Sequence, residues 1–376
     1  MLQRIHIALV GGQPMPVYLG IEESNADLIV LIHSAQSKDK ALDIAAHYGD
    51  ATRLVEFDPV DISMILASVR GLLDEYAQDE VIVNITGGTK PWSIAFLIES
   101  EKRSNVRLVY VDQNCVFYDY SALQEKTDVK FNPQLSLDMD TIMAYNGQIP
   151  ESHHLLSEYT EEDRNVVEKI KRIRKRFFVD FNKLTFDFER KSQGRSSYTL
   201  KDYSSIEVNR KEPSVHFVFR NHETIVQDVV LRSPNVMRLV FNSGWFEYEV
   251  GYLASHWSHA KEVWMNSVYK TEDGRQAKNE IDVIVNTGVK LLMIECKTQI
   301  FQPTDIDKFH TAVKNYGGMG CKALFITESV MRRDAYEKCR DSNVISFSLN
   351  HYPTLEEAGK ALYEKLDNEI ININAR

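Results

Sequence analysis

The sequence predicts an α/β fold built from an N-terminal doubly wound parallel sheet and a separate C-terminal α/β domain. Three observations lead to this prediction. Apolar runs alternate with helical patterns through the first third of the 376 residues, and a helix, a β-hairpin, a helix and a strand follow one another after residue 235. The region between them shows neither pattern. At this length, two or three domains are expected, each large enough to bury a core.

The N-terminal strands are continuous apolar runs, as expected for a parallel sheet with helices on both faces. They cover residues 4–10, 27–33, 53–57, 81–85 and 106–111, and residues 115–118 end the sheet. Helical patterns lie between them at residues 38–48, 62–77 and 92–103. Such sheets bind ligands beyond the carboxyl ends of their strands, so the loops at those ends are candidate binding sites.

Two of these loops are unusual. The first strand is followed by Gly11, Gly12, Gln13 and Pro14, and the fourth by Thr86, Gly87, Gly88, Thr89 and Lys90. Glycines expose backbone N–H groups, the next helix adds its N-terminal dipole and Lys90 adds a charge, so the second loop suits a phosphate. A tight turn with Thr89 as the helix cap explains the same residues equally well. The Walker A and G-x-G-x-x-G spacings are missing, which disfavours an ATPase or a dehydrogenase.

Residues 133–234 are predicted to be a linker and connecting region, for which a winged-helix-like fold is one candidate. Residues 133–150 have the composition of a linker. Residues 161–181 predict a helix that begins with acidic residues and continues with basic ones, matching the helix dipole. A basic helix could contact a phosphate backbone, although a solvated charged face is the commoner explanation.

The C-terminal domain, residues 235–376, is organised around a predicted hairpin. Its strands, 280–285 and 289–296, flank Asn286, Thr287 and Gly288. Alternation places Glu295 and Lys297 on one face and Cys296 on the other, with Asp282 on the partner strand. Two carboxylates and an amine provide hard oxygen ligands for Mg²⁺ or Mn²⁺ and a cation beside an attacked phosphate. The structural alternative is a half-buried strand that ends in solvated charges.

A predicted helix precedes the hairpin, with Ser243 as its cap and apolar residues at positions 246, 250, 253 and 257. Glu247 and Glu249 flank this apolar stripe, and either could add a third carboxylate to the hairpin. The pattern alone does not choose between them. Beyond the hairpin, the sequence predicts helices at 305–316, 331–342 and 355–370 and strands at 321–327 and 344–347.

Composition limits the classes of function. A formal net charge of −10 argues against a protein that coats nucleic acid by electrostatics alone, but leaves room for a nuclease with a locally basic groove. The four scattered cysteines indicate free thiols and neither disulfides nor a zinc site. No signal peptide and no apolar run near ~20 residues is present, so a cytoplasmic protein without a membrane partner is expected.

Two motifs in this chain are similar to motifs of known protein families. The segment I-D, twelve residues, E-C-K, preceded by a helix with G-W-F-E, resembles PD-(D/E)xK restriction-like nucleases, with Asp282, Glu295 and Lys297 at the signature positions and Glu247 matching the upstream glutamate. Ile281 stands where a proline precedes the aspartate. The sequence N-I-T-G-G-T-K in residues 1–132 resembles a CRISPR-associated Rossmann-fold (CARF) sensor domain. The combination is similar to the CARF-nuclease effectors of type III CRISPR systems.

The resemblance implies a homodimeric, metal-dependent endonuclease that is activated by a cyclic oligoadenylate, most simply cyclic tetraadenylate, and cleaves DNA or RNA with little sequence preference. The two glycine loops would bind the activator. Asp282, Glu295 and the Cys296 carbonyl would bind Mn²⁺ or Mg²⁺, with Lys297 and Glu247 completing the catalytic set. Two alternatives remain: a nucleotide-responsive regulator that binds nucleic acid without cleaving it, and a constitutive restriction or repair nuclease.

Overall fold

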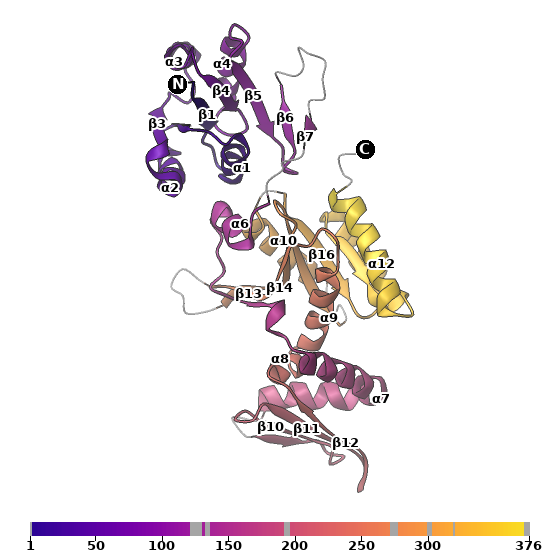
Figure 1. Cartoon of the computed structure of the whole chain (residues 1–376). Helices are drawn as coiled ribbons and strands as arrows, with labels where there is room; N and C mark the ends of the chain where they lie inside the picture. Colours follow the sequence, from indigo (N-terminus) through magenta and orange to yellow (C-terminus); the bar gives the residue numbers. More distant parts are fainter. Residues whose placement is uncertain are drawn as a thin grey trace. The chain divides into compact units, whose positions relative to one another are not determined.

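The computed structural model describes residues 2–120, 130–131, 136–191, 196–270, 277–298, 303–318 and 320–371 (Figure 1). The chain forms two compact units rather than three consecutive regions. The first comprises the described residues of 1–149, 286–291 and 313–321, and the second those of 150–285, 292–312 and 322–376. In the described part of the chain, no helix is both long and apolar enough to cross a bilayer. Each of the four cysteines lies in the described chain, and none forms a disulfide.

The first unit contains a seven-stranded sheet in the order β3-β2-β1-β4-β5-β6-β7. Its strands are β1 (Arg4–Leu9), β2 (Leu28–His33), β3 (Thr52–Glu56), β4 (Glu80–Asn84), β5 (Val106–Val111), β6 (Phe117–Asp119) and β7 (Lys130–Phe131). The first five are parallel, and β6 and β7 are antiparallel additions at one edge. The predicted α/β class and Rossmann-like sheet are therefore confirmed.

Four helices connect the parallel strands: α1 (Met15–Ser24), α2 (Lys38–Tyr48), α3 (Ile62–Glu75) and α4 (Lys90–Ser100). Helix α1 is not predicted by the sequence pattern. Eight of its ten residues are buried, so it has no polar stripe to produce a helical pattern, and Pro16 lies in its first turn. Proline is tolerated there because the first helical N–H groups have no partner within the helix.

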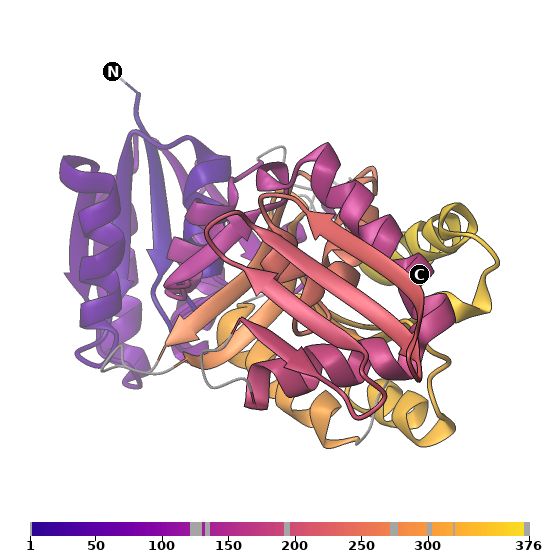
Figure 2. The same ribbon diagram turned by 90° about the horizontal axis from the view of Figure 1, so that it is seen from below.

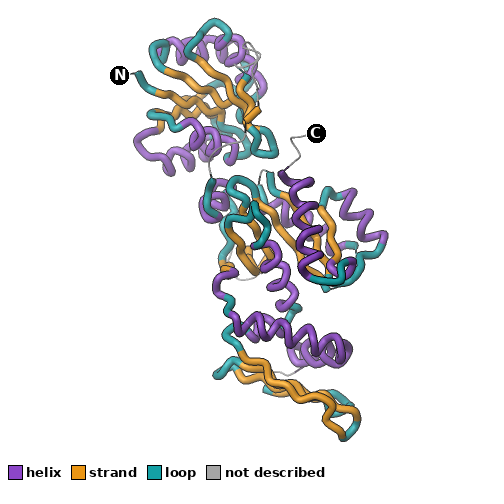
Figure 3. The backbone as a smooth tube through the Cα atoms, turned by 45° about the vertical axis from the view of Figure 1, so that its right-hand side comes forward, coloured by secondary structure: helices purple, strands orange, loops and turns teal. Residues whose placement is uncertain are grey.

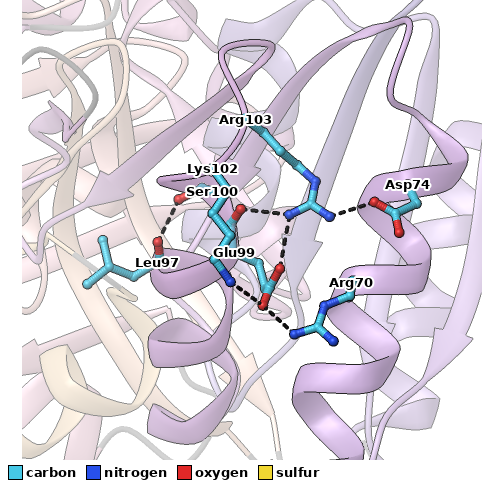
Figure 4. A network of polar contacts seen from close by, with 7 residues as sticks. All are labelled: Arg70, Asp74, Leu97, Glu99, Ser100, Lys102 and Arg103. Atoms are coloured by element: carbon cyan, nitrogen blue, oxygen red, sulfur yellow. Dashed lines mark hydrogen bonds and ion pairs between the residues drawn. The ribbon is translucent and has the colours of Figure 1, made fainter.

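Helices α3 and α4 are joined by a network around the buried carboxylate of Glu99 (Figure 4). Arg70 of α3 and Lys102 each lie 3.0 Å from Glu99 Oε1, and Arg103 lies 3.1 Å from Oε2. Arg103 also reaches Asp74 of α3 at 2.6 Å. Hydrogen bonds from Arg70, and then from Lys102 and Arg103, lower the pKa of Glu99 to about 2.

We expect Glu99→Gln to destabilise the first unit by about 1–2 kcal/mol at neutral pH, a figure reduced because Arg70 and Lys102 are more than half exposed. The folded-state pKa is depressed, so this contribution is present above about pH 4.5 and is lost as the pH falls toward 2. Urea unfolding across this range should show a shallower acid dependence for the variant. Glu101→Gln, at an exposed site without an ion pair among the described residues, is the control. Equal acid dependence in parent and Glu99→Gln would contradict the assignment.

The second unit contains a six-stranded sheet in the order β17-β16-β15-β14-β13-β8. Its strands are β8 (Ser152–Leu155), β13 (Glu262–Lys270), β14 (Ala277–Asn286), β15 (Leu291–Lys297), β16 (Lys322–Thr327) and β17 (Ile345–Ser348). Its helices are α9 (Gly244–Ser255), α10 (Thr304–Tyr316), α11 (Arg333–Asp341) and α12 (Leu355–Leu366). Strands β14 and β15 are neighbours joined by a short turn, as the hairpin prediction required.

The connecting region has more structure than predicted. Helix α6 (Met139–Asn146) occupies the expected linker, whose first residues, 133–135, lie outside the described chain. Then α7 (Glu161–Lys191), which is kinked at Phe177, packs on a four-stranded antiparallel sheet (Figures 2 and 3). The strands are β9 (Ser197–Thr199), β10 (Ser205–Asn209), β11 (Ser214–Asn221) and β12 (Thr224–Arg232), and α8 (Val236–Val240) follows.

The segment of α7 that follows the kink at Phe177 covers this sheet. Its apolar face carries Phe181, Leu184 and Phe188, which belong to the same buried core as Phe217 and Phe219 of β11.

Candidate functional site

The hairpin brings together three of the predicted catalytic residues. Asp282 lies on β14 and is 8% exposed, and Glu295 and Lys297 lie on β15. The Lys297 Nζ lies 2.5 Å from Glu295 Oε1. The backbone N–H of Cys296 donates to Asp282 Oδ2 at 2.7 Å, which ties the carboxylate of one strand to the backbone of the other. The Cys296 side chain is buried, on the opposite face of the strand.

The structure also separates the two glutamates between which the sequence could not choose. Glu247 of α9 accepts a hydrogen bond from Asn266 Nδ2 at 2.7 Å and interacts electrostatically with Lys297 and Glu295. Glu249 instead forms an ion pair with Lys171 of α7 at 2.5 Å. The third carboxylate beside the hairpin is therefore Glu247. Ser243 occupies the N-cap position as predicted but makes no capping hydrogen bond, because its backbone is left-handed, with φ of 66°.

Burial and mutual repulsion dominate the electrostatics of this cluster. Burial, followed by the charges of Glu295 and Glu247, raises the pKa of Asp282, and burial also raises that of Glu295. The pKa of Glu247 rises to about 7, again mainly through burial. Burial lowers the pKa of Lys297, but the attraction of Asp282 and Glu295 outweighs it and raises the pKa overall. Three carboxylates facing one amine make a site that a further cation would stabilise.

The donor set fits a hard divalent cation, since such ions prefer carboxylate and carbonyl oxygens. The side chains are not, however, arranged as the ligands of a bound cation would be. Over the described residues, no three His, Cys, Asp or Glu side chains form a group that could hold a metal ion as they stand. Contacts with Lys297 and with the Cys296 amide engage one oxygen each of Glu295 and Asp282.

The two glycine loops of the first unit meet at the carboxyl ends of β1 and β4. A Cβ placed on Gly11 would lie 2.7 Å from the backbone nitrogen of Gly88, and one on Gly87 would lie 2.0 Å from the Leu9 carbonyl oxygen. Gly88 has φ of +70°. Glycine is thus required at these positions for the loops to pack, whether or not they bind a ligand.

The remaining residues of these loops differ in their environments. Thr86 has a structural role, since its hydroxyl donates to Asn84 Oδ1 at 2.6 Å and accepts from the Val111 N–H at 2.7 Å. Thr89 precedes α4 but makes no cap bond, and its buried hydroxyl has no partner among the described residues. Pro14 accepts the first hydrogen bond of α1. The other three, Gly12, Gln13 and Lys90, are exposed.

Sequence reasoning missed Lys40, whose Nζ donates to the carbonyl oxygen of Gly12. The order of the strands in the sheet would have pointed to Lys40. Strands β1 and β2 are neighbours, so the helix that follows β2 begins at the edge where the loop after β1 lies. Lys40 is in the first turn of that helix.

The fold and these two sets of residues define a class: an α/β protein with a Rossmann-like unit that carries two glycine loops and a second α/β unit that carries a cluster of acids around a lysine. Comparison with known proteins agrees with this class. Residues 5–139 match the family model CARF_Card1, the Card1 CARF domain. This match supports the CARF resemblance of the loop motif. No curated protein compared with the chain is similar enough in sequence to count as a relative.

Solved structures share the fold over nearly the whole chain. VC1899 from Vibrio cholerae aligns with a TM-score of 0.71 at 13% identity, covering 97% of this chain and 98% of that one. Can2 from Sulfobacillus thermosulfidooxidans, solved in complex with cyclic tetra-adenylate, aligns with a TM-score of 0.69 at 16% identity, covering 98% and 99%. A type III CRISPR defence DNA nuclease activated by cyclic oligoadenylate aligns at 0.54 and 15% identity, over 87% of this chain and 46% of that one.

Proposed function

We propose that the chain is a metal-dependent nuclease of type III CRISPR defence, activated by a cyclic oligoadenylate and cleaving DNA, RNA or both. The observation that carries the proposal is the meeting of Asp282, Glu295, Lys297 and Glu247 in a chain whose residues 5–139 match a CARF domain. The likeness to Can2 with its bound cyclic tetra-adenylate makes the tetraadenylate the first activator to test.

The activator would bind where the two glycine loops meet. Residues 11–14 and 86–90 offer backbone N–H groups and the N-terminus of α4, and Lys40 and Lys90 would supply charge for the phosphates. A two-fold symmetric cyclic ligand suits a symmetric dimer that presents the same loops twice. Helix α4 offers a face for this dimer, because Ile94, Leu97 and Ile98 are 52%, 46% and 41% exposed. Sedimentation of the chain with and without the ligand would test the homodimer.

In the acidic cluster, Asp282, Glu295 and the Cys296 carbonyl would hold Mn²⁺ or Mg²⁺, which when bound polarises the phosphate and lowers the pKa of water. Glu247 would complete the site or orient a water molecule. Lys297 lies beside Glu295, and its ammonium group would stabilise the charge that develops on the attacked phosphate. Its raised pKa keeps it protonated for this role.

The proposed activation has a candidate route within the first unit. Helix α1 begins after Pro14, and its Tyr18 stacks on Tyr145 of α6 with ring centroids 3.9 Å apart. The Tyr145 hydroxyl donates to Glu22 of α1 at 2.9 Å. Just before α6, Leu137 exchanges hydrogen bonds of 2.7 Å with Gly288 and Asn286 at the hairpin turn. Asn286 ends β14, four residues after Asp282. These contacts, followed by the covalent chain of β14, therefore connect the loop of residues 11–14 to the acidic cluster.

We expect Tyr145→Leu to separate binding from activation. A ligand can change activity only through its different affinities for two states, and removing the contact between α1 and α6 should weaken that linkage. Activator affinity should stay within about threefold of the parent, and stimulation of cleavage should fall about tenfold, the size of a coupling near 1.4 kcal/mol. Tyr145→Phe, which keeps the stacking, should lose less. Full stimulation in Tyr145→Leu would rule out this route.

The decisive experiment incubates supercoiled plasmid and labelled single-stranded DNA and RNA with Mn²⁺ or Mg²⁺ and a panel of cyclic oligoadenylates. Cleavage that requires both metal and activator would support the proposal. Equal cleavage without activator would favour a constitutive nuclease. Activator-dependent retention of nucleic acid without cleavage would favour a binding regulator.

A further inference from the structure

The second unit contains a cavity of about 560 Å³ that is lined by none of the residues of the acidic cluster, Glu247, Asp282, Glu295 and Lys297. Lys171, Lys175 and Phe178 line it from α7, and Trp245 and Glu249 line it from α9. The other lining residues come from the loop after β16, from residues 349–354 and from the start of α12. Because residues 349–354 run directly into α12, four separate segments of one unit build the cavity.

This cavity borders the strand that carries Glu295 and Lys297. Two of its lining residues, Glu328 and Ser329, donate backbone hydrogen bonds of 3.0 and 3.1 Å to the carbonyls of Lys297 and Thr298. Helix α9 also contributes residues both to the cavity and to the acidic cluster. Trp245 and Glu249 line the cavity one turn apart, and Glu247 between them interacts with the acidic cluster.

The acidic groups around the cavity are already paired with cations of α7. Lys171 pairs with Glu249 at 2.5 Å. The buried Arg174 pairs with Glu328 at 2.7 Å and lies over the Trp245 ring, 4.3 Å from its centroid. Lys175 is exposed and has no ion-pair partner in the part of the chain that the structure describes. Its charge is available to a ligand.

An exposed aromatic ring accompanies this lysine. Phe178 is 48% exposed, three residues after Lys175, and both line the cavity across the bend that α7 makes at Phe177. Exposing half of a phenylalanine ring to water is unfavourable unless a partner covers it. Arg174 lies over this ring, 5.1 Å from its centroid, and the ring is still half exposed. A cation beside an exposed aromatic ring is the combination with which proteins bind single-stranded nucleic acids, through phosphate attraction and base stacking.

We propose that this cavity binds an unpaired nucleotide of the substrate strand close to the scissile phosphate, with Lys175 contacting its phosphate and Phe178 stacking on its base. This inference rests on the proposed nuclease function and adds to it the path of the substrate. It assigns a role to the basic helix, for which the sequence favoured only a solvated face.

The test measures the binding of a fluorescent single-stranded oligonucleotide to the full chain with activator, in a Glu295→Gln background that prevents cleavage. Lys175→Ala should raise the Kd about three- to tenfold and reduce the salt slope by about one. Phe178→Ala should raise it about fivefold or more, as expected for one stacked base, and should weaken duplex binding less. Lys169→Ala, which removes an exposed lysine of α7 that does not line the cavity, is the matched control.

Affinities of Lys175→Ala and Phe178→Ala equal to that of Lys169→Ala would overturn the inference, and so would an equal loss for duplex and single strand in Phe178→Ala. These outcomes are separate from the failure of the proposed function. If the parent chain cleaves but the three variants bind alike, only the cavity assignment is wrong. If the parent cleaves nothing under any condition, the nuclease proposal fails, whatever the binding results.

Discussion

Replacing Glu295 with glutamine is expected to lower the rate of cleavage at least about a thousandfold. The substitution keeps the shape of the side chain but removes the negative charge that the proposed metal site needs, and it removes the ion pair with Lys297. The variant should still bind the activator, because the glycine loops belong to the other unit. Initial rates on labelled DNA and RNA, with activator affinity measured in parallel, check both statements.

Lys297→Ala should give a loss of similar size for a different reason. It leaves the carboxylates in place but removes the cation proposed to stabilise the attacked phosphate, so the loss should appear mainly in kcat. Glu189→Gln, on α7 outside the acidic cluster, controls for the loss of a carboxylate in the same unit. Cleavage at the parental rate by either Glu295→Gln or Lys297→Ala would remove these residues from the catalytic assignment.

The acidic cluster shows which features of a site can be predicted from local sequence pattern and which cannot. Alternation along a strand placed Glu295 and Lys297 on one face, and the Asn286-Thr287-Gly288 turn brought Asp282 opposite them, because both relationships are local. The choice between Glu247 and Glu249 was not local. It depended on Lys171, which lies 78 residues away and pairs with Glu249, and no helical pattern contains that information.

The connecting region also shows that contacts between residues far apart in the chain cannot be predicted from local pattern. The polar composition of residues 133–150 indicated a linker, yet Tyr145 is buried and tied to Glu22, 123 residues away. The helix α6 that carries Tyr145 is only eight residues long, too short to be recognised by periodicity. Its place depends on tertiary contacts that outweigh local composition. Lys40 and the cavity beside α7 escaped prediction for this reason too, since each joins residues far apart in the chain.

Gly87→Ala is expected to abolish the response to the activator, with activator affinity reduced about a hundredfold or more. A Cβ at this position would meet the Leu9 carbonyl oxygen at 2.0 Å, and backbone atoms on both sides leave little room for adjustment. The loops after β1 and β4 would have to separate, at a cost of about 1–3 kcal/mol in stability. Isothermal titration with cyclic tetraadenylate and thermal unfolding measure the two effects.

Gly12→Ala is the matched control, since a Cβ there would meet nothing within 4 Å. It should leave the unfolding temperature unchanged, which separates the packing effect of Gly87 from a general effect of adding a methyl group to a glycine loop. Lys40→Ala in the same titration should also keep the unfolding temperature and weaken binding about three- to tenfold, as expected for one exposed charge facing a phosphate. Parental activator affinity in Gly87→Ala would show that the ligand binds elsewhere, because the loop cannot keep its shape around that methyl group.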